Sequence, residues 1–268
     1  MIDLVPTAGL CNRMRTIDAA LTLAERLQRP LRIHWMPNKD AQCRFSDLFQ
    51  PIPGVRVVEG MRRASRLAVR FGKRHELMER VGKLTSTTYY NWDENQRLEH
   101  DAAALTPIAR RRHTHIISYW RFLDRPDKFT AFKPLPALQQ RIDEATASFD
   151  SHTIGVHIRR SDNEKAIATS PTHLFEQAMQ QAIDADGATR FYLATDSQET
   201  KALMRARFGD RIMTSEDHAE RTSVAGMEHA LVELYTLART SRLFGSFFSS
   251  YSRTAAEIGR IEEVTIKL

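Results

Sequence analysis

Two adjacent arginines, Arg159 and Arg160, directly follow an apolar run rich in β-branched residues at positions 153–158. Each guanidinium offers a planar set of N–H donors and stays charged at neutral pH, so the pair suits the oxygen atoms of a pyrophosphate. Ser249 and Ser250 stand where a helix should begin, and the free backbone N–H groups of a helix start bind phosphate readily. These residues predict an anion-binding site; a cluster of surface ion pairs is the alternative.

Alternating strands and helices are expected to position these residues in the C-terminal half. Apolar runs predict strands at residues 153–158, 191–195, 211–213 and 243–247. Periodic apolar patterns predict helices at 172–183, 224–240 and 249–259, and a further helix that ends at 208. This order is typical of a doubly wound parallel sheet, whose ligands bind beyond the carboxyl ends of the strands. The residues expected to meet at that edge are His157, Arg159, Arg160, Ser161, Asp162, Asn163, Thr195, Asp196, Ser246, Ser249, Ser250 and Arg253.

The N-terminal half begins with the pattern of a strand at 2–5, a helix at 12–27 and a second strand at 31–35. Such a βαβ opening favours a parallel sheet. A connecting helix is expected at 138–149, and a chain of 268 residues commonly divides into two halves. We therefore expect an α/β protein with one domain at 1–150 and another at 151–268.

The positive charge of the chain lies in its first half. Residues 1–150 contain 25 Lys and Arg against 17 Asp and Glu, a net +8, whereas residues 151–268 contain 14 against 16, a net −2. This asymmetry indicates an anionic partner for the first half, such as a nucleic acid, a membrane surface or an anionic glycan. Residues 61–83 could form a basic amphipathic helix on a membrane; a solvated surface helix is the alternative.

The N-terminus has no pattern of a secretion signal, and no apolar run approaches the roughly 20 residues that span a bilayer. Cys11 and Cys43 are the only cysteines, which favours two reduced thiols and a cytoplasmic enzyme, with possible peripheral membrane contact. Asp184 and Asp186 have the D-x-D spacing of metal-dependent glycosyltransferases, but they precede a strand instead of following one. A loop is the better interpretation of that motif.

Four blocks of the sequence resemble one family. Residues 155–162, which read GVHIRRSD, resemble the H-[IV]-R-R-[TSG]-D block of the fucosyltransferase superfamily, which includes α1,6-, nodulation-type, α1,2- and protein O-fucosyltransferases. Residues 191–196 and 232–253 are similar to later blocks of that superfamily, in the same order. Residues 8–15 resemble its first loop, with Cys11 where glycine is usual. Residues 35–150 resemble nothing in it.

The resemblance implies a GT-B architecture, with two Rossmann-like domains facing a cleft and the donor bound by the C-terminal one. It also implies inverting transfer of L-fucose from GDP-β-L-fucose to a glycan or glycolipid, without metal or other cofactor. This chemistry is physically coherent, because negative charge grows on the leaving phosphate while the C1–O bond breaks, and fixed arginines stabilise it.

The resemblance also assigns roles to single residues. Arg159 would stabilise the leaving group with Arg160 in support, and Asp162 would orient Arg160 or the fucose hydroxyls. Glu233 would accept hydrogen bonds from guanine, with the backbone near His157; a charge on the helix surface is the alternative for Glu233. The expected donor-binding positions are His157, Ser161, Asp196, Glu233, Ser249, Ser250, Arg253, Gly9, Asn12 and Arg13.

The general base stays unassigned, because Glu164 lies near the arginine block but out of register with the family pattern. Two other interpretations stay open. One keeps the fold and uses a different nucleotide-sugar. The other, from a different class, is a nucleic-acid-binding protein that uses its basic N-terminal half, whereas the transferase interpretation expects no nucleic acid. The sequence predicts neither the acceptor, nor the linkage formed, nor the oligomeric state.

Overall fold

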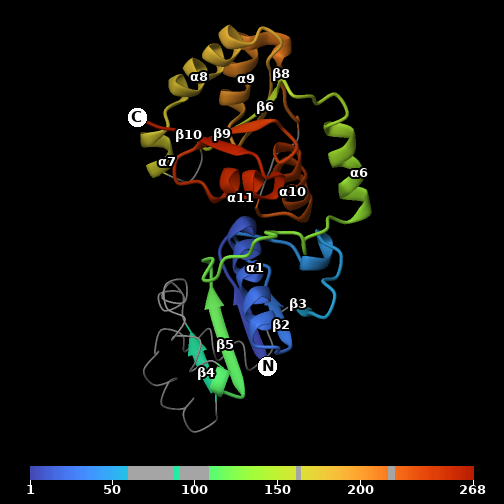
Figure 1. Cartoon of the computed structure of the whole chain (residues 1–268). Helices are drawn as coiled ribbons and strands as arrows, with labels where there is room; N and C mark the ends of the chain where they lie inside the picture. The colour runs from blue at the N-terminus through green and yellow to red at the C-terminus, as the bar shows by residue number, and fades with distance from the viewer. Residues whose placement is uncertain (60–86, 91–108, 161–163, 217–220) are drawn as a thin grey trace. The chain divides into compact units, whose positions relative to one another are not determined.

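A computed structural model describes residues 1–59, 87–90, 109–160, 164–216 and 221–268 of the chain (Figure 1). The chain divides into two compact units. The first comprises residues 1–135 and 221–224, and the second comprises residues 136–220 and 225–268. The helix at 136–145 therefore belongs to the second unit, whereas the sequence placed the boundary after it. No helix in the described ranges is long and apolar enough to cross a membrane.

The first unit contains a parallel sheet of five strands in the order β3-β2-β1-β5-β4. Its central strand β1 is buried along its whole length, as the apolar opening of the sequence predicts. The elements of this unit are β1 (Ile2–Pro6), α1 (Leu10–Arg26), β2 (Leu31–Trp35), a short 3₁₀ helix (Phe45–Asp47), β3 (Arg56–Glu59), β4 (Thr87–Tyr90) and β5 (His113–Ser118).

The second unit contains another parallel sheet of five strands, in the order β10-β9-β6-β7-β8. Its strands are β6 (Thr153–Ile158), β7 (Arg190–Thr195), β8 (Ile212–Met213), β9 (Arg242–Ser246) and β10 (Glu262–Ile266). Its helices are α6 (Pro136–Ala145), α7 (Glu164–Thr169), α8 (Thr172–Ala185), α9 (Gln198–Phe208), α10 (Val224–Leu237) and α11 (Ser250–Gly259), with a 3₁₀ turn at Gly209–Arg211. The predicted α/β class, with parallel sheets, is confirmed.

The two faces of β6 have different neighbours, because successive side chains of a strand point to opposite faces. Ile154, Val156 and Ile158 belong to the apolar core that also contains Phe175 of α8 and Met204 of α9. In Figure 1, α8 and α9 lie on one side of this sheet, and α10 and α11 lie on the other.

Gly155 and His157 occupy the other face of β6, toward α10. A Cβ atom on Gly155 would lie 2.8 Å from both Leu243 Cδ1 and Thr240 Oγ1, so this close approach requires glycine. The same alternation places His157 on the α10 side of the sheet, at the end of the strand that precedes the arginines.

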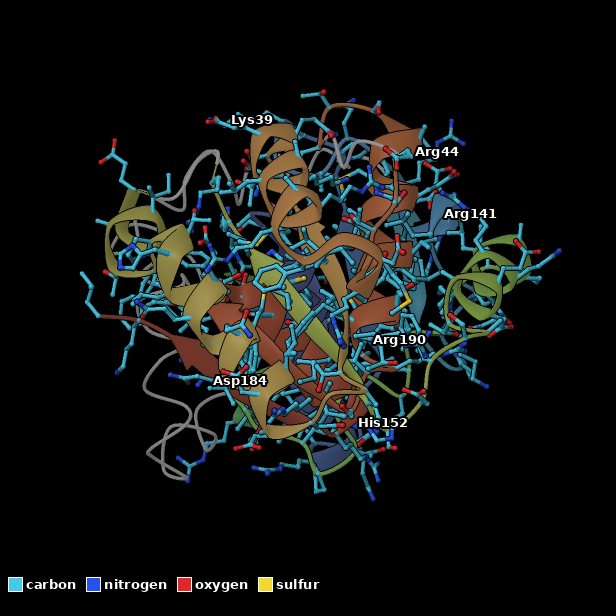
Figure 2. The ribbon with its side chains drawn as sticks, turned by 90° about the horizontal axis from the view of Figure 1, so that it is seen from above. Lys39, Arg44, Arg141, His152, Asp184 and Arg190 are labelled. Carbon is cyan, nitrogen blue, oxygen red and sulfur yellow. The ribbon has the colours of Figure 1, made fainter. Side chains whose placement is uncertain are left out.

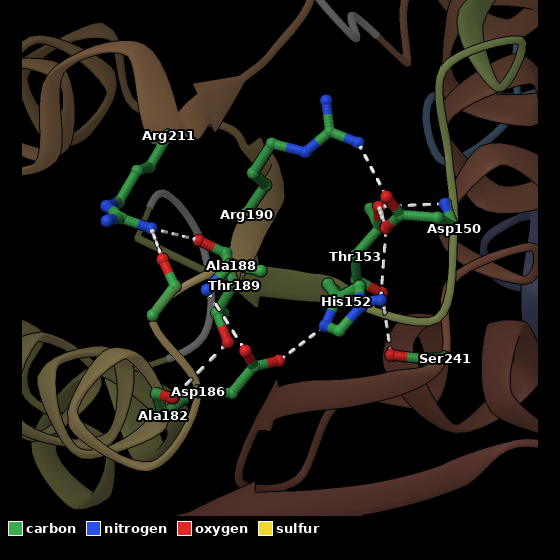
Figure 3. A network of polar contacts seen from close by, with 11 residues as sticks. Asp150, His152, Thr153, Ala182, Asp186, Ala188, Thr189, Arg190, Arg211 and Ser241 are labelled. Atoms are coloured by element: carbon green, nitrogen blue, oxygen red, sulfur yellow. Dashed lines mark hydrogen bonds and ion pairs between the residues drawn. The ribbon is translucent and has the colours of Figure 1, made fainter.

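The D-x-D motif lies at the opposite, amino edge of this sheet (Figure 3). Asp186 follows α8 and accepts hydrogen bonds from His152 Nδ1 at 2.5 Å and from the Ala188 N–H at 3.0 Å. The hydrogen bond that His152 donates to Asp186 raises the pKa of His152. Asp184 is exposed on the last turn of α8 (Figure 2). The motif therefore belongs to a structural network at a loop.

Candidate functional site

The carboxyl ends of β6 and β9 form the point where the strand order of the second sheet reverses. These strands are neighbours, but the chain leaves β6 toward β7 and leaves β9 toward β10. In open parallel sheets, ligands bind in the crevice at such a point. Arg159 follows β6 directly, and its backbone N–H donates to Ser246 Oγ, at the end of β9, at 3.1 Å. Ser246 Oγ in turn donates to the His157 carbonyl at 3.3 Å.

The turn from β9 into α11 adds a helix start to the same edge. Ser249 is the N-cap residue of α11, and its Oγ accepts a hydrogen bond from the Tyr251 N–H at 3.3 Å. The preceding residue, Phe248, has a left-handed φ of 57° and is 63% exposed, which is unusual for a bulky side chain. The turn therefore directs the first N–H groups of α11 to the edge where Arg159 lies.

Arg160 takes a different position from its neighbour. Its side chain donates to Thr172 Oγ1 at 3.0 Å, to the Arg159 carbonyl at 2.8 Å and to the Ser170 carbonyl at 2.7 Å. Its backbone N–H donates to Asp196 Oδ1 at 2.7 Å, which joins the ends of β6 and β7. Burial lowers the pKa of the Arg160 guanidinium. Arg160 thus joins the end of β6 to the start of α8.

His157 is buried at the end of β6, and its ring lies against the ring of Tyr251, with centroids 4.8 Å apart. The Tyr251 hydroxyl donates to the Ala230 carbonyl of α10 at 2.6 Å. The pKa of His157 is lowered to about 4, mainly by burial; Asp196 opposes this shift, and the charges of Arg159 and Arg160 add to it. The imidazole is therefore neutral at pH 7 and supplies no positive charge to the site.

Glu233 is buried on α10, with only 4% of the residue exposed, so the interpretation as a helix-surface charge is wrong. Its Oε1 lies 3.5 Å from His229 Nε2, one turn earlier on the same helix. Within the described residues, this oxygen has no hydrogen-bond partner. Burial, together with the charge of Glu233, raises the pKa of Tyr192 on the facing strand β7.

The structure brings most of the predicted residues of the second unit to one edge. Asp196 and Arg253 are exposed there, and Ser250 is half-buried at the first position of α11. Ser161 and Asp162 lie outside the described residues. In the described part of the chain, no group of three or more His, Cys, Asp or Glu residues could hold a metal ion.

The remaining predicted residues lie at the start of α1 in the first unit. Gly9 is the N-cap residue of this helix and makes no side-chain cap, and Asn12 is half-buried. Arg13 is fully buried and donates to the Ala8 carbonyl at 2.8 Å, the Met36 carbonyl at 2.7 Å and Asn38 Oδ1 at 2.8 Å. Burial lowers the pKa of Arg13 to about 10. Arg13 therefore braces the first loop from inside the unit.

No role was predicted from the sequence for two residues near the site of the second unit, Tyr251 and His229. Tyr251 packs on His157, and no spacing signal connects residues so far apart in the chain. His229 precedes Glu233 by four residues on a predicted helix, and this i,i+4 spacing was a signal that the pair would meet.

No protein-family model matches the chain, and neither does any curated protein sequence. Solved structures match its fold. The NodZ α1,6-fucosyltransferase soaked with GDP-fucose has a TM-score of 0.64 at 20% identity, over 96% of this chain and 92% of that chain. A variant of Arabidopsis thaliana FUT1 in complex with GDP has a TM-score of 0.65 at 14% identity, over 98% of this chain and 69% of that chain. POFUT1 in complex with GDP has a TM-score of 0.59 at 10% identity, over 100% and 98%.

These matches support the α/β fold that the resemblance of the sequence implied. The three proteins are fucosyltransferases by name or description, and two of them were solved with GDP and one with GDP-fucose. The identities of 10–20% relate this chain to them at the level of the fold.

Proposed function

We propose that this protein is a glycosyltransferase that transfers L-fucose from GDP-β-L-fucose to a glycan or glycolipid, with inversion and without metal. The observation that carries the proposal is the crevice at the carboxyl ends of β6 and β9. There, the backbone N–H of Arg159 donates to Ser246 Oγ, and Ser249 caps the start of α11. An arginine and the start of a helix, both at the carboxyl edge where the strand order reverses, suit the phosphates of a nucleotide-sugar.

In the proposed reaction, the bond between fucose C1 and the β-phosphate oxygen breaks, and its electron pair stays on that oxygen. The acceptor hydroxyl oxygen bonds to C1 from the opposite face and gives its proton to a base. Arg159 stabilises the negative charge that grows on the phosphate, and its backbone is fixed at the end of β6 by the hydrogen bond to Ser246 Oγ before the reaction begins. The base stays unassigned, and Asp162, which lies outside the described residues, keeps its predicted role in orienting Arg160 or the fucose hydroxyls.

Arg160 serves this site as a positioning residue. Its three side-chain hydrogen bonds and the contact of its backbone with Asp196 fix residue 160, next to Arg159 at the end of β6. This arrangement supports the sequence-based assignment of Arg159 as the main contact of the leaving group and Arg160 as its support. In the first unit, Gly9 and Asn12 keep their predicted role near the donor, and Arg13 braces the turn at Ala8 that precedes them.

Glu233 is the residue that we propose to recognise the guanine base. Guanine presents two neighbouring donors, N1–H and N2–H₂, and one carboxylate can accept both hydrogen bonds. A buried carboxylate is costly unless donors satisfy it, and Glu233 Oε1 has no such donor in the described part of the chain. A guanine base would supply the missing donors.

Several finer predictions remain open. These are the cytoplasmic location, the cleft between the two units, and the acceptor-binding role of the first unit. Contact of residues 61–83 with a membrane also stays a prediction, since these residues lie outside the described ranges.

Calorimetric titration with GDP, UDP and an RNA oligonucleotide tests the proposal. We expect GDP to bind with roughly micromolar affinity and UDP to bind at least about tenfold more weakly, because uracil lacks the two neighbouring donors. RNA is expected not to bind. Binding of RNA without binding of either nucleotide diphosphate would replace the transferase interpretation with the nucleic-acid-binding one.

A further inference from the structure

Ser170, which lies between α7 and α8, is fully buried, with an exposed fraction of 0%. A serine just before a helix commonly caps it, but the N-cap residue of α8 is Pro171. The hydroxyl of Ser170 has other partners: it accepts a hydrogen bond from the Phe247 N–H at 2.8 Å and donates to the Ile266 carbonyl at 2.5 Å. The hydroxyl therefore serves the ends of two strands, β9 and β10.

These two contacts lie at the carboxyl edge of the second sheet. Ser246 and Ile266 are the last residues of β9 and β10, and they are register partners. Phe247 follows β9 directly, so the Ser170 hydroxyl joins the first N–H after one strand to the last carbonyl of the other. A hydroxyl can donate one hydrogen bond while it accepts another, which suits this position. The turn that leads to Ser249 thus starts from a backbone position that Ser170 fixes.

The backbone carbonyl of Ser170 contacts the arginine block. It accepts a hydrogen bond from Arg160 Nη2 at 2.7 Å, beside the contact of Arg160 Nε with Thr172 Oγ1 at 3.0 Å. Hydrogen bonds from a charged donor are stronger than those between neutral groups. One residue therefore holds two segments of the proposed phosphate site, the residues after β6 through its carbonyl and the turn after β9 through its hydroxyl.

The turn after β9 has a backbone conformation that needs support. Phe248 has a left-handed φ of 57°, which is unfavourable for a bulky side chain and persists where the surrounding structure imposes it. Ser170 fixes the residue before Phe248, and the residue after it, Ser249, is the N-cap of α11. The path of this turn sets the direction of the first N–H groups of α11, which are the groups that bind phosphate at a helix start.

We infer that Ser170 is a positioning residue of the phosphate site, which sets the start of α11 relative to Arg159 and Arg160. Its side chain is buried, so it acts through the groups that it holds. This inference rests on the proposed GDP-sugar donor and adds to it a residue that lies outside the blocks of resembling sequence.

Calorimetric titration with GDP and with guanosine measures how much the phosphates contribute to binding, because the two ligands share base and ribose. We expect the wild-type protein to bind GDP at least about 100-fold more tightly than guanosine. In Ser170→Ala, the Phe247 N–H and the Ile266 carbonyl lose their shared partner. GDP is then expected to bind about tenfold more weakly, with an unchanged affinity for guanosine. A residue that only supports the fold would change both affinities or neither.

Thr189 offers a matched control on the same sheet. It is 2% exposed, precedes β7 at the amino edge, and donates from its hydroxyl to the Ala182 carbonyl at 3.2 Å. Thr189→Val removes a buried hydroxyl far from the strand ends and is expected to keep the wild-type preference for GDP over guanosine. If a thermal melt shows that Ser170→Ala does not fold, Ser170→Cys replaces it. The thiol is close in size to the hydroxyl but a weak donor and acceptor, so the same selective loss of GDP affinity is expected.

The possible outcomes separate this inference from the proposed function. A wild-type preference for GDP over guanosine in the folded Ser170 variant would overturn the inference, and so would an equal loss of that preference in Thr189→Val. A wild-type protein that binds neither ligand, or binds GDP no more tightly than guanosine, would instead refute the proposed function.

Discussion

Replacing Arg159 with alanine is expected to lower kcat for sugar transfer by about 10²- to 10³-fold. The reason is that the guanidinium stabilises charge that develops on the leaving phosphate only as the C1–O bond breaks. The substitution should leave the thermal unfolding midpoint close to that of the wild-type protein, because the hydrogen bond from the backbone N–H of residue 159 to Ser246 Oγ is kept in the variant. Steady-state kinetics with GDP-fucose and a glycan acceptor, together with a thermal melt, measure both effects.

Two controls sharpen this prediction. Arg159→Lys keeps the charge but loses the planar fork, so we expect an activity between those of the wild type and the alanine variant. Arg205→Ala removes an exposed arginine of α9 that pairs with Glu216, and it is expected to leave turnover unchanged. Near-normal turnover of Arg159→Ala would remove the role that we assign to this residue. A rise in KM with unchanged kcat would assign it to substrate binding alone.

Replacing Arg13 with methionine is expected to lower the free energy of unfolding by about 3–5 kcal/mol. The substitution leaves three oxygen acceptors without their donor, on Ala8, Met36 and Asn38, at a fully buried position. It also removes the contact of the guanidinium with the Trp35 ring, 4.8 Å from its centroid. Denaturant unfolding of the two proteins measures the difference.

The same variant separates bracing of the loop from direct contact with the donor. If Arg13 braces the loop, Arg13→Met should lose stability. If Arg13 only contacts the donor, the variant should have normal stability and weaker GDP binding. Arg26→Met, at the exposed end of the same helix, is the control, and it should change stability by no more than about 0.5 kcal/mol. Normal unfolding of Arg13→Met would contradict its assignment as a brace.

Periodicity in the sequence predicted the elements that position the site. The β-branched run that ends at Ile158 became β6, and its burial explains the apolar residues Ile154, Val156 and Ile158. The alternation of strands and helices also predicted the edge at which Arg160 meets Asp196 and Arg159 meets Ser246. These predictions were correct because strands and helices have periods of only a few residues. Hydrophobic patterns with such short periods can be detected in a single sequence.

The hydrogen-bond partners of Arg160 and Arg13 could not be predicted from such patterns. Arg160 donates to the Ser170 carbonyl, and Arg13 donates to the Met36 carbonyl, both in loops that follow other elements. The path of a loop depends on tertiary packing, and a carbonyl that accepts a hydrogen bond leaves no mark on residue type. The position of Arg13 nevertheless held one signal, because it lies four residues before Ile17 on the buried face of the helix.

The low pKa of His157 could not be predicted from the sequence either. Its low pKa of about 4 follows from burial against Tyr251 and α10, which a single sequence does not display. A neutral imidazole at this place leaves the positive charge of the crevice to arginine, which supports Arg159 as the leaving-group contact.

A crystal structure with bound GDP tests the central claim most directly. The account predicts the β-phosphate within hydrogen-bond distance of the Arg159 guanidinium and of the backbone at Ser249 and Ser250, at the start of α11. GDP bound with its phosphates away from Arg159 and from the start of α11 would contradict it.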